Sequence, residues 1–291
     1  MVRSTMCFFA LLAVFILSGT EPAHAGSYTI SMLPMYSTEE INRRITPMAE
    51  YLSQETGLRI TPVLASTFDQ YSKRLANGSI DIGYENPYIY ALAAKEHEVV
   101  AMAVKGKDGD KLRGIIITRS DSGIEKIDDI MDKKIMIVGY TAAGGYLSQK
   151  LTLLENDIDI SQDCTVEESP DNKHENVIFS VFAGDVDAGF IRESALHKVD
   201  DFVPPSAIRV LERTAWLPNW AFSISRKMAQ VDREKIIKAL RKLKTSDNVL
   251  EMLKIKALRP ATDAEYDPIR KAAGIAEPDA SLQVQIPEAG L

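Results

Sequence analysis

The sequence predicts an α/β protein of two lobes, each a mostly parallel sheet flanked by helices. From Tyr28 onward, short apolar runs alternate with helical patterns, the order that gives parallel strands with helices on both faces. A polar turn at 105–110 precedes a second series of the same kind, and the chain then returns through a strand at 220–225. A length of 291 residues suits about two domains.

The first series extends to about residue 115. Its helix at 38–56 carries Ile41, Ile45, Met48 and Leu52 on one stripe, which is the spacing of an amphipathic helix. We expect strands at 28–33, 58–64, 80–84 and 99–104, and helices at 38–56, 68–76 and 87–95.

The second series contains a buried strand that passes through small residues directly into a helix. The N–H groups of such a turn lie at the positive end of the helix dipole, where an anion can accept them. We therefore predict an anion-binding turn formed by Tyr140, Thr141, Ala142, Ala143 and Gly144. In this second series we expect strands at 114–118, 134–138, 165–168, 188–191 and 208–211 and helices at 144–155 and 175–183. The chain is then expected to end with a strand at 220–225 and helices at 232–243, 249–255 and 263–273.

We expect residues 26–115 and 214–291 to form the first lobe and residues 116–213 the second. Ligands of open α/β sheets bind beyond the carboxyl ends of the strands, so two facing lobes would enclose one site between them. Tyr84 and Asn86 follow a strand of the first lobe, and Arg192 follows the strand 188–191 of the second. These residues are candidates for the ligand site, although Arg192 could instead pair with the neighbouring Glu193 or with another carboxylate.

The first 25 residues have the pattern of a secretory signal peptide. Arg3 supplies the positive charge, residues 7–17 form a short apolar run, and Ala23-His24-Ala25 is a small-residue cleavage site. The apolar run is too short to span a bilayer. We expect cleavage after Ala25 and export of a chain that keeps one cysteine and therefore no internal disulfide.

Charge and motifs exclude several classes of function. A net charge of −7 argues against nucleic acid and anionic membranes as partners. His97 and His197 have no histidine or cysteine at metal-ligand spacing, and Cys164 has no adjacent histidine. No phosphate-binding loop, dinucleotide fingerprint or nucleophile elbow occurs. We expect no metal, no cofactor and no enzymatic activity.

Several short motifs occur in the order and spacing of a known family. They are FDQY at 68–71, NGSIDIGY at 77–84, RGIII at 113–117, DSGI at 121–124, TAAG at 141–144, KHEN at 173–176 and GDVDAG at 184–189. In these motifs the sequence resembles the periplasmic solute-binding proteins of the phosphate, phosphite and phosphonate class, which serve ABC importers. The resemblance implies a periplasmic monomer with the two-lobed, type II-like periplasmic-binding-protein fold that captures a small oxyanion for a membrane permease.

The resemblance also implies roles for single residues. The family's anion-binding turn usually reads Ser-Thr-Ser-Gly, and here Thr141 keeps the first hydroxyl while Ala142 and Ala143 lack the other two. The family's two anion-contacting tyrosines align best with Phe68 and Leu112, although Tyr71, Tyr84 or Tyr140 could compensate for them.

The family's histidine is His174, which could otherwise be a solvated residue at a helix start, and which charges near neutral pH. An acidic group that holds an ammonium in some members falls near Glu193, and its acidic partner falls near Asn219 or Trp220, which carry no charge.

Two rival functions use the same cleft. A sensory partner of a membrane receptor or histidine kinase would have the same ligand chemistry. An exported hydrolase would need a positioned nucleophile and base, and the alanines of the turn count against it.

Overall fold

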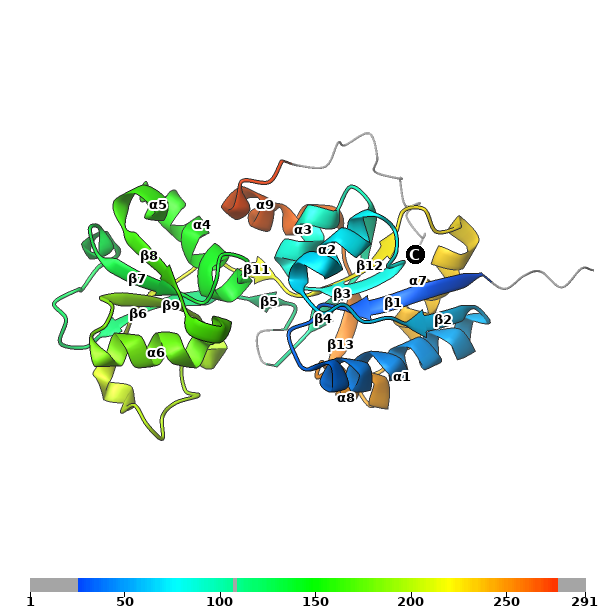
Figure 1. Cartoon of the computed structure of the whole chain (residues 1–291), viewed down its shortest axis with the longest axis horizontal. Coiled ribbons are helices and arrows are strands. Elements are labelled where there is room, and N and C mark those ends of the chain that lie inside the picture. Colours follow the sequence, from blue (N-terminus) through cyan, green and yellow to red (C-terminus); the bar gives the residue numbers. More distant parts are fainter. Residues whose placement is uncertain (1–25, 107–108, 277–291) are drawn as a thin grey trace, which may run out of the picture.

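The computed structural model describes residues 26–106 and 109–276. Figure 1 shows two α/β lobes side by side, with short strands between them. The predicted signal peptide at 1–25 lies outside the described residues. Within the described ranges, no helix is both long and apolar enough to cross a membrane.

The first lobe is built on a six-stranded sheet of order β13-β4-β12-β3-β1-β2. β1 pairs in parallel with β2 and β3, whereas β12 lies antiparallel between β3 and β4, and β13 lies antiparallel beside β4. The sheet is therefore mixed: the strands β1, β2, β3 and β4 of the predicted first series run in one direction, and β12 and β13 run against them. The strands are β1 (Ser27–Met32), β2 (Arg59–Pro62), β3 (Ile82–Glu85), β4 (His97–Val104), β12 (Ala221–Ser225) and β13 (Ala257–Pro260).

Helices cover both faces of this sheet, with α1 and α8 on one side and α2 and α3 on the other (Figure 1). The predicted stripe of α1 is buried in the core at 2% exposure or less. The helix starts where the Ser37 hydroxyl accepts a hydrogen bond from the N–H of Glu40, and it ends at Gly57 in the left-handed conformation. The helices are α1 (Thr38–Thr56), α2 (Phe68–Ala76), α3 (Pro87–Ala93), α7 (Gln230–Lys242) and α8 (Asn248–Met252).

The second lobe is built on a five-stranded sheet of order β10-β6-β9-β7-β8. β7 pairs in parallel with β8 and β9, and β6 pairs antiparallel with β9 and β10, so this sheet is mixed as well. Its elements are β6 (Gly114–Arg119), β7 (Lys134–Ile137), β8 (Thr165–Glu168), β9 (Ala188–Arg192), β10 (Ile208–Arg213), α4 (Ser148–Glu155), α5 (Ile160–Asp163) and α6 (His174–Ala183).

Two short antiparallel strands, β5 (Lys111–Leu112) and β11 (Leu217–Pro218), lie where the chain crosses between the lobes. The Ser148 hydroxyl at the start of α4 forms hydrogen bonds to both segments that connect the lobes. It accepts from the N–H of Gly114 at 2.9 Å and donates to the carbonyl of Ala215 at 2.7 Å. The last helix, α9 (Asp267–Ala273), contacts both α3 and α4. The residue boundaries of the lobes at 115 and 214 stay a prediction.

Candidate functional site

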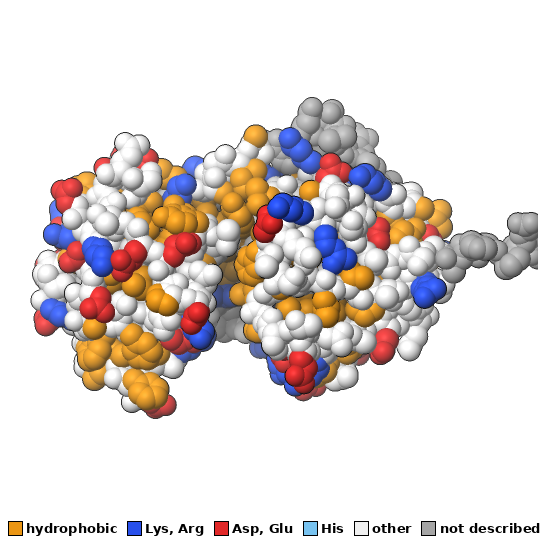
Figure 2. All heavy atoms as spheres, viewed as in Figure 1, with side chains coloured by type: hydrophobic (Ala, Val, Ile, Leu, Met, Phe, Trp, Pro, Cys, Tyr) orange, Lys and Arg blue, Asp and Glu red, His pale blue; other side chains and the backbone are white. Residues whose placement is uncertain are grey.

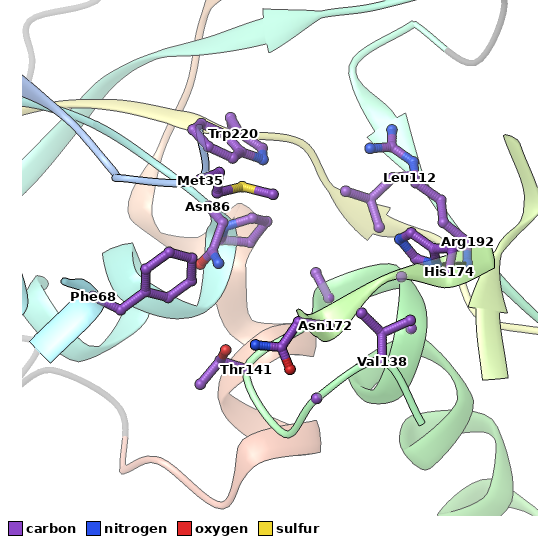
Figure 3. A pocket seen from close by; sticks show the side chains of 16 residues that line it. Met35, Phe68, Asn86, Leu112, Val138, Thr141, Asn172, His174, Arg192 and Trp220 are labelled. Atoms are coloured by element: carbon purple, nitrogen blue, oxygen red, sulfur yellow. Dashed lines mark hydrogen bonds between the residues drawn. The ribbon is translucent and has the colours of Figure 1, made fainter. Parts of the chain in front are cut away.

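A cleft lies between the two lobes, where the surface in Figure 2 is hollowed. Its empty volume is about 740 Å³, open solvent included. Figure 3 shows side chains from both lobes facing across it. The lining residues are Met35, Phe68, Asn86, Pro87, Leu112, Val138, Gly139, Thr141, Ala142, Ala143, Gly144, Gly145, Asn172, His174, Arg192 and Trp220.

The predicted anion-binding turn forms one wall of the cleft. The chain leaves β7 and enters α4 through a π-helical turn at Ala143–Leu147, where a regular helix was expected. The turn folds back on the strand so closely that a Cβ on Gly145 would lie 2.6 Å from the Cβ of Val138. Only glycine fits at this position, which explains the choice of residue at 145.

The N–H groups of this turn divide into two sets. Ala142 donates its N–H to the Gly139 carbonyl at 2.9 Å, and Tyr140 donates its N–H to the Glu168 carboxylate at 3.0 Å. The prediction that Ala142 offers its N–H to an anion is therefore wrong. No acceptor is found among the described residues for the N–H groups of Thr141, Ala143 and Gly144. These three donors remain for a ligand.

A buried glutamine holds the turn in place. The Gln149 side-chain amide donates to the carbonyls of Gly144 at 3.1 Å, Ile115 at 3.0 Å and Ile191 at 3.0 Å. It thereby fixes the turn to β6 and to the end of β9. Arg192 follows Ile191 directly, and a Cβ on Gly144 would lie 3.1 Å from its side chain. The sequence contained no sign of this anchor.

His174 enters the cleft from the first turn of α6. The N–H of Arg192 donates to its Nδ1 at 3.1 Å, so the proton of the neutral ring lies on Nε2. Burial, helped by the charge of Lys198, lowers the pKa of His174 to about 4. The expectation that His174 supplies charge near neutral pH is therefore wrong, and the ring offers one neutral N–H donor.

Arg192 lies at the end of β9 and lines the cleft, as Figure 3 shows. Glu193 instead pairs with Arg113 at 2.6 Å and with Arg213 at 3.1 Å. The hydrogen bond from Arg113 holds the pKa of the Glu193 carboxyl below its usual value. The Glu193 carboxylate is therefore held by two other arginines, and Glu193 does not line the cleft.

The remaining predicted residues divide between the cleft and its surroundings. Asn86 lines the cleft, and its Oδ1 caps α3 by accepting from the N–H of Ile89 at 2.9 Å. Tyr84 is fully buried behind Trp220, with ring centroids 5.1 Å apart. Tyr140 is half exposed and packs edge-on against Tyr146. Neither Tyr84 nor Tyr140 lines the cleft.

Phe68 and Leu112, which align with the family's tyrosines, both line the cleft. Sequence reasoning missed Met35 and Asn172 as lining residues. Asn172 has a φ of 52° just before α6, a conformation that asparagine tolerates. An asparagine beside the KHEN motif was the available signal.

The described part of the chain gives little support for a metal site or for a catalytic cysteine. No group of three or more metal-ligating side chains occurs among the described residues. Burial raises the pKa of the Cys164 thiol to about 11, so this cysteine stays protonated and unreactive at neutral pH.

Two α/β lobes around a cleft lined with anion donors define a solute-binding protein of the periplasmic type. A family model described as "ABC transporter, phosphonate, periplasmic substrate-binding protein" matches residues 30–266. The chain therefore belongs to the family of periplasmic substrate-binding proteins of ABC phosphonate transporters.

Solved structures share the fold at low sequence identity. A binding protein component of an ABC phosphonate transporter from Pseudomonas aeruginosa is 15% identical with a TM-score of 0.62, covering 85% of each chain. PhnD1 from Prochlorococcus marinus in complex with methylphosphonate is 11% identical with a TM-score of 0.66, covering 85% of this chain and 97% of that one. A Xanthomonas citri protein bound to ATP is 17% identical with a TM-score of 0.69, covering 86% and 96%.

Proposed function

We propose that this protein captures a small oxyanion between its lobes, with the anion held by the turn at 141–144, and delivers it unchanged to the permease of an ABC importer. The observation that carries the proposal is the chemistry of the lining. Among the described residues that line the cleft, Arg192 alone has a permanent charge, and no carboxylate is present. The lining thus adds one cationic side chain to its neutral donors and contributes no carboxylate that would repel an anion, although the whole chain is acidic.

Several donors are available to one anion. The N–H groups of Thr141, Ala143 and Gly144, the Thr141 hydroxyl and the Nε2–H of His174 belong to residues that line the cleft. Each hydrogen bond to a charged oxygen contributes about 1.5–3 kcal/mol.

The two lobes would close on the ligand through the crossings at β5 and β11. Closure removes water from the cleft, which strengthens each hydrogen bond to the anion. Family membership implies a periplasmic location, and we propose export with cleavage after Ala25.

The lining also favours some anions over others. Ala142 and Ala143 give no hydroxyl, so the oxyanion loses two contacts of the family pattern. An ammonium group in this cleft would be desolvated without a carboxylate beside it, which is costly. We therefore propose that phosphate, phosphite or methylphosphonate binds more tightly than aminoethylphosphonate.

A thermal-shift screen of the chain from Gly26 onward tests the proposed function. The panel contains phosphate, phosphite, methylphosphonate, aminoethylphosphonate, sulfate and simple carboxylates. A ligand at 100 times its dissociation constant stabilises the fold by about 2.7 kcal/mol. At least one phosphorus oxyanion is expected to raise the melting temperature. A panel without any shift would contradict oxyanion capture, and tightest binding of aminoethylphosphonate would contradict the proposed preference.

A further inference from the structure

The hydrogen-bond donors described above lie on one side of the cleft. The turn at 141–144 connects β7 with α4, His174 begins α6, and Arg192 ends β9, so all of them come from the second lobe. The backbone N–H groups of the turn and the Nε2–H of His174 therefore hold an oxyanion from that lobe.

The opposite side of the cleft is largely apolar. Met35 follows β1, Phe68 begins α2, and Trp220 precedes β12, so these three come from the first lobe. Figure 3 shows them across the cleft from His174 and Arg192. Among the described lining residues that belong to these first-lobe elements and the loops beside them, none carries a charge.

Two neutral polar groups interrupt the apolar side. Asn86 lines the cleft, and its Oδ1 already accepts from the N–H of Ile89 at 2.9 Å. Trp220 carries an indole N–H. Neither group brings several donors to one point as the turn at 141–144 does, so the charged oxygens of a ligand are expected on the second-lobe side.

The apolar side combines a fixed residue with an adaptable one. Trp220 is 6% exposed, and its ring centroid lies 5.1 Å from that of Tyr84 and 4.9 Å from the Nζ of Lys105. Met35 is 50% exposed, and the methionine side chain adapts readily to the shape of a partner. Singly exposed apolar residues are ordinary, but Met35 shares one cleft with Phe68 and Trp220, which is typical of a site for an apolar group.

The cleft is also larger than a bare oxyanion requires. Its empty volume is about 740 Å³, open solvent included, and sites for organic ligands have about 300–1,000 Å³. A phosphate bound at the turn would leave Met35, Phe68 and Trp220 facing water. An organic group attached to phosphorus would cover these side chains and remove apolar surface from water, which is favourable.

We propose that the ligand is a phosphorus oxyanion that carries an apolar organic group, such as an aryl or a branched alkyl group. The oxygens bind at the turn, and the apolar group lies against Met35, Phe68 and Trp220. This inference deepens the proposed function and rests on it, because the oxyanion end occupies the turn at 141–144.

Isothermal calorimetry with methylphosphonate and phenylphosphonate tests the apolar subsite. Both ligands present the same phosphonate group and differ in the apolar group on phosphorus. The wild-type protein is expected to bind phenylphosphonate at least about tenfold more tightly, because the ring buries more apolar surface than the methyl group. The heat-capacity change of binding should also be more negative for phenylphosphonate, as it is when apolar surface leaves water.

Met35→Gln places a polar side chain of similar length on the apolar side. It should lower the affinity for phenylphosphonate at least about threefold and change the affinity for methylphosphonate less than about twofold. Met35→Leu keeps the apolar character and should keep the preference.

Leu92→Gln is the matched control, because Leu92 in α3 is 48% exposed and does not line the cleft. It should alter neither affinity. Both replaced side chains are half exposed, so the variants are expected to fold, and thermal unfolding checks this.

Three results would overturn the apolar subsite. They are equal affinity of the wild-type protein for both ligands, an unchanged preference in Met35→Gln, and an equal loss for both ligands in that variant. Methylphosphonate binding without a preference for phenylphosphonate refutes the apolar subsite alone, whereas failure of both ligands to bind refutes the proposed function as well.

Discussion

Replacing Ala143 with proline removes one N–H donor of the anion-binding turn and leaves the backbone path possible. Ala143 is the first residue of the π-helical turn, a position where proline's fixed φ and missing N–H are tolerated. The preceding residue, Ala142, is extended at φ −83° and ψ 108°, the conformation that proline requires before it. No hydrogen bond to a described residue is lost, because the Ala143 N–H has no acceptor there.

The expected cost appears in binding rather than in folding. A hydrogen bond from a backbone N–H to a charged oxygen contributes about 1.5–3 kcal/mol, so the dissociation constant of methylphosphonate should rise about 10- to 150-fold. Isothermal calorimetry measures the affinity, and thermal unfolding establishes that the variant is folded.

Ala143→Ser is the matched control, since it keeps the N–H and adds the hydroxyl of the family pattern. It should bind methylphosphonate as tightly as the wild-type protein or more tightly. A folded Ala143→Pro variant with unchanged affinity would refute the role of this turn.

Three further predictions concern the turn, the crossings and the buried histidine. Gly145→Ala places a methyl group 2.6 Å from Val138, so it should lower the free energy of unfolding by about 1–3 kcal/mol and weaken methylphosphonate binding. An unaltered melting temperature would show that the turn is not tightly packed. Ser148→Ala leaves the buried Gly114 N–H without its partner and should lower the free energy of unfolding in urea by about 1–3 kcal/mol. An unchanged free energy of unfolding would show that Ser148 does not stabilise the segments that connect the lobes. Burial lowers the pKa of His97 from 6.5 to about 4, so the folded state binds fewer protons than the unfolded state between these values, and about 3 kcal/mol of stability is lost as the pH falls through them. His97→Gln should flatten this part of the pH profile of unfolding, and an equally steep profile would assign the loss to other groups.

The local elements were predictable because their signals are local. The helix α1 has the predicted bounds, since its apolar stripe, the preceding Ser37 and the following Gly57 lie within one stretch of chain. The position of the turn at 141–144 between β7 and α4 was predictable for the same reason, because its small residues mark a close approach of the backbone.

Long-range pairing was not predictable from the same patterns. β12 lies antiparallel between β3 and β4, although more than 100 residues separate it from them in the chain. Each of the strands β5 and β11 has only two residues, too short for any periodicity to appear.

The chemistry of the site also depends on distant partners. His174 is neutral because the folded chain buries it, and its tautomer follows from the N–H of Arg192. Lys105 approaches Trp220 across more than 100 residues of sequence. Residue type alone predicted a charged histidine and placed Lys105 in a polar turn.

The most direct measurement is a crystal structure of the chain from Gly26 onward grown with methylphosphonate. The phosphonate oxygens are expected within hydrogen-bonding distance of the N–H groups of Ala143 and Gly144 and of His174 Nε2, with the lobes closed around the anion. An anion bound outside the cleft, or a cleft without the anion at a methylphosphonate concentration far above the dissociation constant measured by calorimetry, would contradict capture of an oxyanion by this turn.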